Sequence, residues 1–81
     1  MHVEHAGVFD VRCRFSRTES PAELTLVVGE SRWTTRLDAG VSCCRLEKLE
    51  FEAGDVEIRA MVIEGQMSRA VHQIDVSADH R

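Results

Sequence analysis

The amino-acid sequence predicts an all-β fold, a small antiparallel β-sandwich of about six strands with jelly-roll-like or immunoglobulin-like architecture. Three observations predict it. Apolar and polar residues alternate with a period of two in one segment after another, turn-forming residues separate these segments, and no segment requires a substantial helix. The chain has 81 residues, which is the length of one domain, and we assign residues 1–81 to it.

The first strand is predicted from Val8 to Phe15. Its alternate residues Phe9, Val11, Cys13 and Phe15 are apolar, whereas the residues between them are charged. This is the pattern of a strand with one buried face. The polar segment 16–21 contains the only proline and is predicted to be a loop.

A β-hairpin is predicted next. Leu24, Leu26 and Val28 share one face of its first strand, and the dipeptide Gly29-Glu30 suits a two-residue turn that needs a positive φ. The returning strand is predicted from Ser31 to Leu37. A turn at residues 38–40 ends it.

The alternation slips between Cys43 and Phe51, because Leu46 and Leu49 are three residues apart while Leu49 and Phe51 are two apart. A β-bulge near Glu47-Lys48 accounts for this spacing. A short helical turn is the alternative, since Leu46 and Leu49 would then share a helical face.

Two more strands complete the prediction. After a turn at residues 53–55, the strand at residues 56–63 is, of all the predicted strands, the most apolar on both faces and is expected at the centre of a sheet. Glu64-Gly65-Gln66 is the next turn. The last strand is predicted from Ala70 to Val76, with His72, Ile74 and Val76 on one face.

Composition and charge exclude several classes of function. The chain is 43% hydrophobic and 30% charged, as expected of a folded domain, and its formal net charge of -4 argues against nucleic acid and anionic lipid as partners. No apolar run is long enough to span a bilayer, and no signal peptide is visible at the start. Localisation is left open: cytoplasmic if the chain is full-length as given, exported if it is an excised domain.

Three cysteines, Cys13, Cys43 and Cys44, make an odd count without the spacing of zinc ligands. Reduced thiols are therefore expected, and a strained disulfide between the adjacent Cys43 and Cys44 is the alternative. Neighbouring residues on a strand point to opposite faces, so at most one of these two cysteines faces the core.

Residue types that could serve in catalysis or metal binding occur in the sequence, but no recognised motif groups them. Nucleophilic catalysis needs a Ser or Cys beside a base that a third group orients, and no such motif occurs. His2 and His5, with Glu4 and His80, could bind a metal if the termini met, but a two-histidine spacing without a third ligand is weak evidence for zinc.

Carboxylates gather around one predicted hairpin. They could in principle perform glycoside hydrolysis, but they alternate with basic residues as cross-strand charge pairs on a solvated face do. The acidic residues are Glu47, Glu50, Glu52, Asp55 and Glu57, and the basic ones are Arg45, Lys48 and Arg59. A solvated face is the preferred interpretation, and no catalytic residue, metal or cofactor is predicted.

Trp33 is the candidate ligand-binding residue, together with Arg32 and Arg36 on the same strand. An exposed aromatic ring can stack on a sugar or anchor a protein interface. A partly buried core position is nevertheless the preferred interpretation of Trp33 itself, because Trp33 shares its side with Thr35 and Leu37. Strands that expose Val27, Met61 or Ile63 would also favour self-association if they lay at a sheet edge.

Three segments resemble the non-catalytic accessory β-modules at the ends of bacterial sulfatases and glycosidases, which are related to carbohydrate-binding jelly rolls. The segment 3–11 is similar to their opening strand, in which Ala-Gly precedes an aromatic-x-Val strand. The segment 46–58 is similar to a hairpin with Ala-Gly at its turn, and the segment 70–76 to the closing strand. The resemblance implies a β-sandwich with an accessory role and contact with glycans.

The sequence therefore predicts a soluble, non-catalytic accessory or interaction module, not an enzyme. Its expected partner is another protein or a second copy of itself, with weak glycan contact as a further activity. The alternative is a small metal- or thiol-dependent enzyme or sensor that uses His2, His5 and His72 or the Cys43-Cys44 pair.

Overall fold

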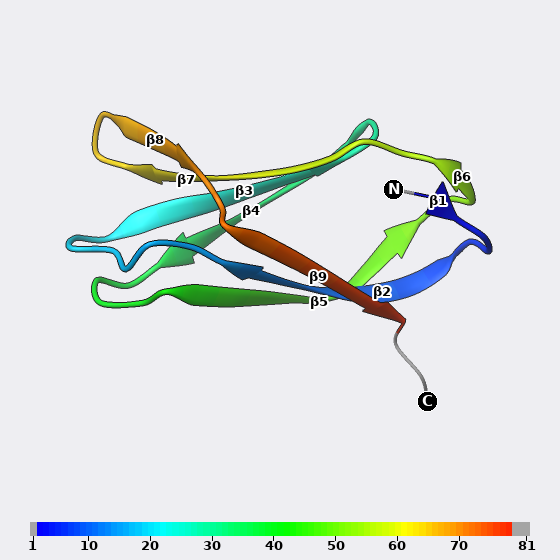
Figure 1. Cartoon of the computed structure of the whole chain (residues 1–81), viewed down its shortest axis with the longest axis horizontal. Helices are drawn as coiled ribbons and strands as arrows, with labels where there is room; N and C mark the ends of the chain where they lie inside the picture. The colour runs from blue at the N-terminus through cyan, green and yellow to red at the C-terminus, as the bar shows by residue number, and fades with distance from the viewer. Residues whose placement is uncertain (1, 79–81) are drawn as a thin grey trace.

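The computed structural model describes residues 2–78, which form nine β-strands and no helix. Two antiparallel sheets lie one above the other and confirm the predicted all-β class, compatible with a small β-sandwich (Figure 1). Within the described residues, no helix is long and apolar enough to cross a membrane.

The upper sheet in Figure 1 has four strands in the order β4-β3-β7-β8, and the lower sheet has three in the order β5-β2-β9. A two-residue ladder, β1-β6, lies beside them near the N-terminus. The upper strands are β3 (Ala22–Val28), β4 (Ser31–Leu37), β7 (Ile58–Glu64) and β8 (Met67–Ala70); the lower strands are β2 (Gly7–Arg14), β5 (Cys43–Phe51) and β9 (Gln73–Ala78); the ladder joins β1 (His2–Val3) to β6 (Gly54–Asp55).

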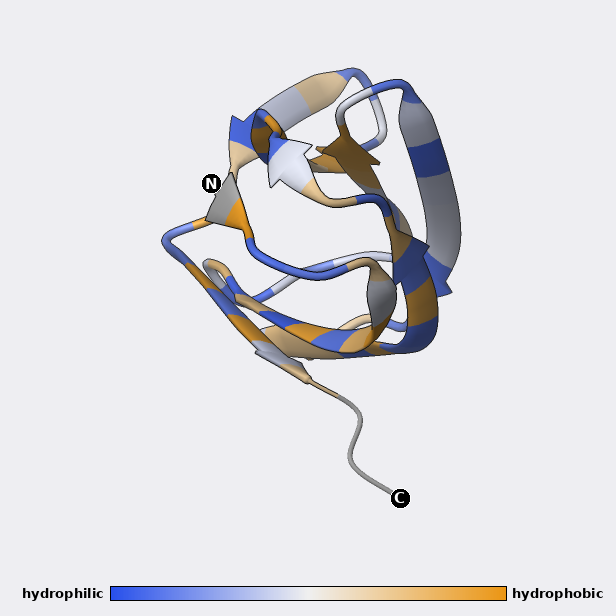
Figure 2. Ribbon diagram, turned by 90° about the vertical axis from the view of Figure 1, so that its right-hand side faces the viewer, coloured by the Kyte–Doolittle hydropathy of each residue, from blue (hydrophilic) through white to orange (hydrophobic). Residues whose placement is uncertain are grey.

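The core lies between the two sheets. Strands show the predicted alternation of hydrophobic and hydrophilic residues (Figure 2). The residues with essentially no exposure are Val11 and Cys13 from the lower sheet, and Leu24, Leu26 and Val62 from the upper sheet. Burial of these inward faces is what stabilises two sheets against each other.

Both two-residue hairpins have the predicted glycine at the first turn position. Val28 pairs with Ser31 across Gly29-Glu30, and Glu64 pairs with Met67 across Gly65-Gln66. Gly29 has a φ of 59° and Gly65 a φ of 62°, while the residue after each has a negative φ. This is the type II′ turn, whose twist matches that of the flanking strands.

The predicted β-bulge is confirmed, and the helical alternative is wrong. The pairing of β2 with β5 shifts between Phe9 and Val11, whose partners are Leu49 and Leu46. Asp10 thus lies opposite two residues, and the second of them, Lys48, has a φ of 58°. The Asp10 carboxylate accepts a hydrogen bond of 3.2 Å from the Lys48 backbone N–H, which compensates for the disrupted ladder.

The end of the chain differs from the prediction. The single strand expected from Ala70 to Val76 is two strands, β8 and β9, which belong to different sheets. Val71 and His72 carry the chain across, and the His72 N–H donates a 2.7 Å hydrogen bond to the Arg14 carbonyl. His72 is therefore exposed in the crossover, although Ile74 and Val76 do pack against the core as expected.

Among the described residues, two of the four exposed large apolar side chains lie on the outer face of the upper sheet. Met61 is 45% exposed and Ile63 is 40% exposed, both on β7. Neither residue lies at a sheet edge, because β7 is an inner strand that pairs with both β3 and β8, so the condition given for self-association through them is not met. Val27 is likewise on an inner strand. The central position predicted for residues 56–63 is confirmed.

Candidate interaction site

Strand β4 is an edge of the upper sheet. Its only neighbour in that sheet is β3, with which all seven of its residues pair from Ala22↔Leu37 to Val28↔Ser31. The strand contains no glycine, proline or bulge. It therefore presents a straight, regular edge along its whole length.

The backbone groups that this edge exposes follow from the hairpin. In a two-residue hairpin the residues flanking the turn form a hydrogen-bonded pair, and hydrogen-bonded pairs then recur at every second residue. Ser31, Trp33 and Thr35 therefore direct their N–H and C=O groups toward β3. Arg32, Thr34 and Arg36 direct theirs away from the sheet, into the position where a further strand would pair.

The side chains of the same three residues lie on the outer face of the sheet. Arg32 and Arg36 are exposed, and Thr34 separates them. Neither guanidinium forms an ion pair within 4.0 Å with any residue in the described part of the chain. The two arginines are four positions apart on the strand, which corresponds to about 13 Å. The structure thus places two of the three predicted ligand-binding residues together at this edge.

Trp33 lies on the opposite face of β4 from the two arginines. It is half-buried, and its ring centroid is 5.9 Å from that of Phe51, with a tilt of 48°. Phe51 in turn stacks on Phe9 at 5.1 Å and 17°. Trp33 therefore takes the partly buried core position that its place beside Thr35 and Leu37 predicted. It links β4 to the lower sheet, and the three candidate ligand-binding residues do not converge on one surface.

The other sheet edges are shorter or interrupted. β8 has four residues and β9 has six. β5 is longer, but the bulge at Lys48 bends it, and Arg45 forms an ion pair of 2.7 Å with Asp10 beside it. Bulges and charged side chains are the usual means by which an edge is protected from pairing. Among the described strands, β4 is the longest regular edge.

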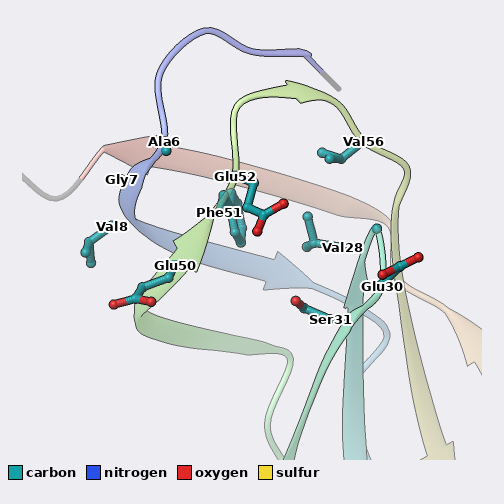
Figure 3. A pocket seen from close by; sticks show the side chains of 11 residues that line it. Ala6, Gly7, Val8, Val28, Glu30, Ser31, Glu50, Phe51, Glu52 and Val56 are labelled. Carbon is teal, nitrogen blue, oxygen red and sulfur yellow. The ribbon is translucent and has the colours of Figure 1, made fainter.

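An open cleft of about 750 Å³ lies next to the turn that leads into β4. Figure 3 shows the Glu52 carboxylate and the Val28 side chain between the end of β5 and the β3–β4 hairpin, while Glu50 and Val8 point outward. Glu30 lies on the hairpin side of the same cleft. Two carboxylates of the predicted acidic group thus line this cleft, and the exposure of Glu50 and Glu52 agrees with a solvated face.

The two histidines whose side chains the structure describes, His5 and His72, do not belong to a metal-binding group of described residues. Among residues 2–78, no group of three or more His, Cys, Asp or Glu side chains is placed to hold a metal ion. His5 is exposed beside an apolar pocket of about 410 Å³ that Val3, Phe9 and Val76 help to line. The His80 side chain considered with His2 and His5 lies outside the described residues, as does the side chain of His2.

One serine and one histidine do meet, which the sequence did not suggest. The hydroxyl of Ser16 is 3.1 Å from Nε2 of His72, across 56 positions of sequence. Within residues 2–78, no third side chain hydrogen-bonds to His72. The pair is exposed and lacks the orienting group that nucleophilic catalysis uses.

The cysteines occupy three different environments. Cys13 is fully buried, Cys44 is half-buried, and Cys43 is exposed on the opposite face of β5. Burial, with smaller contributions from Cys44 and Asp75, raises the pKa of Cys13 to about 11. Burial and the neighbouring Cys43 also raise the pKa of Cys44. A raised pKa disfavours the reactive thiolate, so Cys44 lacks the electropositive setting of a catalytic cysteine.

Comparisons with protein-family models, with curated proteins and with solved structures find no match for this chain. The geometry of β4 is therefore the main basis on which a function can be argued.

Proposed function

We propose that this domain is a non-catalytic interaction module that contacts a protein partner by strand addition along β4. The observation that carries the proposal is the straight seven-residue edge, with outward backbone groups at Arg32, Thr34 and Arg36. An extended peptide can pair with such groups, so that main-chain hydrogen bonds supply affinity and alternate side chains supply specificity. An accessory role beside another domain is part of the same proposal.

The charges on this edge favour an acidic partner strand. Residues of an added antiparallel strand lie directly opposite those of β4 and share their faces. Carboxylates four residues apart, on either side of a small residue, would therefore lie opposite Arg32 and Arg36. The net charge of -4 does not prevent this contact, because physiological salt screens distant charges beyond about 8 Å.

The same charges disfavour a second copy of the chain at this edge. An antiparallel β4–β4 pairing that uses all seven residues is centred on Thr34, and it places Arg32 of each copy opposite Arg36 of the other. Like charges directly opposite are destabilising. The edge thus attracts an acidic strand and repels the β4 strand of a second copy.

Glycan contact is the weaker proposal. Sugars stack on exposed aromatic faces, but Trp33 packs toward Phe51 on the inner side of β4. The resemblance to accessory modules of sulfatases and glycosidases fits an attached domain that makes contacts, and it fits a protein partner as well as a glycan.

A preorganised acidic hairpin tests the proposal. The probe is a cyclised β-hairpin peptide whose free strand carries two glutamates four residues apart with threonine midway, and Trp33 fluorescence reports binding because Trp33 belongs to β4. We expect a saturable change in the wild-type protein and about a tenfold loss of affinity in Arg32→Glu/Arg36→Glu. A lysine version of the hairpin should restore binding to that variant.

Arg59→Glu is the matched control for a single charge reversal, because Arg59 is exposed and lies on the inner strand β7, where its guanidinium forms an ion pair with Glu57 at 3.4 Å. It should leave the affinity for the acidic hairpin within about twofold, since its charge is not at the edge. Equal loss of affinity in Arg59→Glu and Arg32→Glu would show a general charge effect and contradict strand addition at β4.

A further inference from the structure

Two of the three cysteines face each other across neighbouring strands. Cys13 on β2 and Cys44 on β5 are direct register partners in the lower sheet, although 31 positions separate them in the sequence (44 − 13). Cys13 is fully buried and Cys44 is half-buried, so both side chains are directed toward the space between the sheets. The proposed interaction at β4 makes no use of this pair.

The spacing of the two strands suits a covalent bond between them. The Phe15 N–H donates a 2.9 Å hydrogen bond to the Ser42 carbonyl. Phe15 lies two residues after Cys13, and Ser42 lies two residues before Cys44, so these two residues continue the same register. Alternation then makes Cys13 and Cys44 a hydrogen-bonded pair, whose Cα atoms are about 5.5 Å apart. Disulfides span Cα separations of about 4.4–6.8 Å, so the backbone already lies in range.

The adjacent Cys43 is a poorer partner for either thiol. It lies on the opposite face of β5 from Cys44, and its own register partner is Arg14. A bond between Cys43 and Cys44 would require the strand to leave its extended conformation, which the ladder with β2 opposes.

We propose that Cys13 and Cys44 are a modification site, at which a small-molecule disulfide of the glutathione class forms a reversible cross-strand disulfide. The thiolate of Cys44, the more accessible partner, attacks glutathione disulfide, so that a mixed disulfide forms and one glutathione thiolate leaves. The Cys13 sulfur, after losing its proton to solvent, then attacks the Cys44 sulfur and displaces the second glutathione. Two protein thiols are oxidised while one glutathione disulfide is reduced to two glutathione thiols.

The surroundings of the pair make this exchange slow and reversible. The raised pKa values of Cys13 and Cys44 keep both groups protonated at neutral pH, so the rate should rise with pH. The Cβ atoms of a hydrogen-bonded pair are about 4.5–5.5 Å apart, and a disulfide draws them to about 3.5–4.5 Å. The strain of this approach makes the bond easier to reduce than a structural disulfide.

Cys43→Ser in the full 81-residue chain is the test, because it leaves Cys13 and Cys44 as the only thiols and changes an exposed side chain. The folded variant is incubated with glutathione disulfide at mildly alkaline pH, alkylated under denaturing conditions and weighed by mass spectrometry. We expect both thiols to become protected without a glutathione adduct, and dithiothreitol to restore both. In the wild-type protein, tryptic mapping should link the dipeptide Cys13-Arg14 to the peptide that ends at Arg45.

Cys44→Ser is the comparison variant, since it keeps Cys13 and Cys43, which lie on opposite faces of the lower sheet. It should form no intramolecular disulfide under the same conditions. Two free thiols or a stable glutathione adduct in Cys43→Ser would overturn the proposal. A Cys43–Cys44 bond as the main product in the wild-type protein would overturn it as well.

Discussion

Thr18 hydrogen-bonds the loop between β2 and β3 to the loop between β4 and β5. It is 1% exposed, and its hydroxyl donates a 2.8 Å hydrogen bond to the Asp38 carbonyl and accepts one of 3.2 Å from the Val41 N–H. Its backbone adds bonds to Val41 and Gly40. The β2–β3 loop is thereby tied to the loop that leads from β4 into β5, so this residue links the two sheets.

Thr18→Val should destabilise the domain by about 1–3 kcal/mol. The change keeps the shape of the side chain but removes the partner of the Asp38 carbonyl and of the Val41 N–H, in hydrogen bonds that are partly buried. Urea unfolding measures the difference. Thr34→Val, at an exposed position of β4, is the control and should change stability by less than about 0.5 kcal/mol; equal effects would contradict the role given to Thr18.

The raised pKa of Cys13 predicts that the folded domain loses stability at alkaline pH. Its pKa is about 11 in the folded protein against an ordinary value of 9.0, so the folded state binds this proton more tightly than the unfolded state. The stabilisation is complete below about pH 9 and is lost as pH rises from about 9 to 11.

The expected loss from Cys13 between about pH 8 and pH 10.5 is about 2 kcal/mol. Urea unfolding of the wild-type protein and Cys13→Ala, both under a thiol-free reductant, measures it. The chain has no tyrosine and one lysine, but Cys44, whose pKa burial also raises, contributes in the same direction; because both proteins keep Cys44, the difference between them reports Cys13. A pH dependence as steep in Cys13→Ala as in the wild type would show that Cys13 is not its source.

At the scale of the strands, the pattern of the sequence predicted local structure well. The irregular spacing of Leu46, Leu49 and Phe51 predicted the bulge, because an extra residue in a strand must shift its apolar face. The turn at Gly29-Glu30 was predicted for the same kind of reason: backbone conformation there depends on the residues themselves.

Contacts between distant strands could not be predicted in this way. The division into β8 and β9 was missed because the alternation of His72, Ile74 and Val76 continues unbroken across the change of sheet. The Cys13–Cys44 pairing and the edge position of β4 depend on which strands become neighbours, and side-chain period alone does not specify neighbours. The alternation did place Trp33 and the arginines on opposite faces, and it favoured burial of the Trp33 face because Leu37 lies on it, which the structure confirms.

Gly65→Ala should destabilise the domain by about 1 kcal/mol or slightly more. Gly65 has a φ of 62°, and no atom lies within 4 Å of the Cβ that alanine would add, so the cost comes from the backbone alone. Thermal unfolding measures it. Gly7→Ala is the control: Gly7 lacks a positive φ, and the nearest atom to an added Cβ is a ring carbon of Phe9 at 3.9 Å. A smaller loss at Gly65 than at Gly7 would contradict the type II′ turn.

At the scale of the whole molecule, a four-stranded and a three-stranded sheet enclose a thin core. The four-stranded sheet has one long regular edge, β4. Inward residues from both sheets are committed to packing, and within the described chain no cluster of metal ligands is present. Strand β4 is available for contact, and its exposed side chains and outward backbone groups lie on the same three residues.

Amide hydrogen exchange along β4, measured by NMR with and without the acidic hairpin, tests strand addition most directly. In the free protein the amides of Trp33 and Thr35 should be protected by β3, while those of Arg32, Thr34 and Arg36 should exchange fast. Saturating hairpin should slow the exchange of these three amides by at least about tenfold, which corresponds to about 1.4 kcal/mol. Binding of the hairpin without any added protection of Arg32, Thr34 and Arg36 would contradict strand addition at this edge.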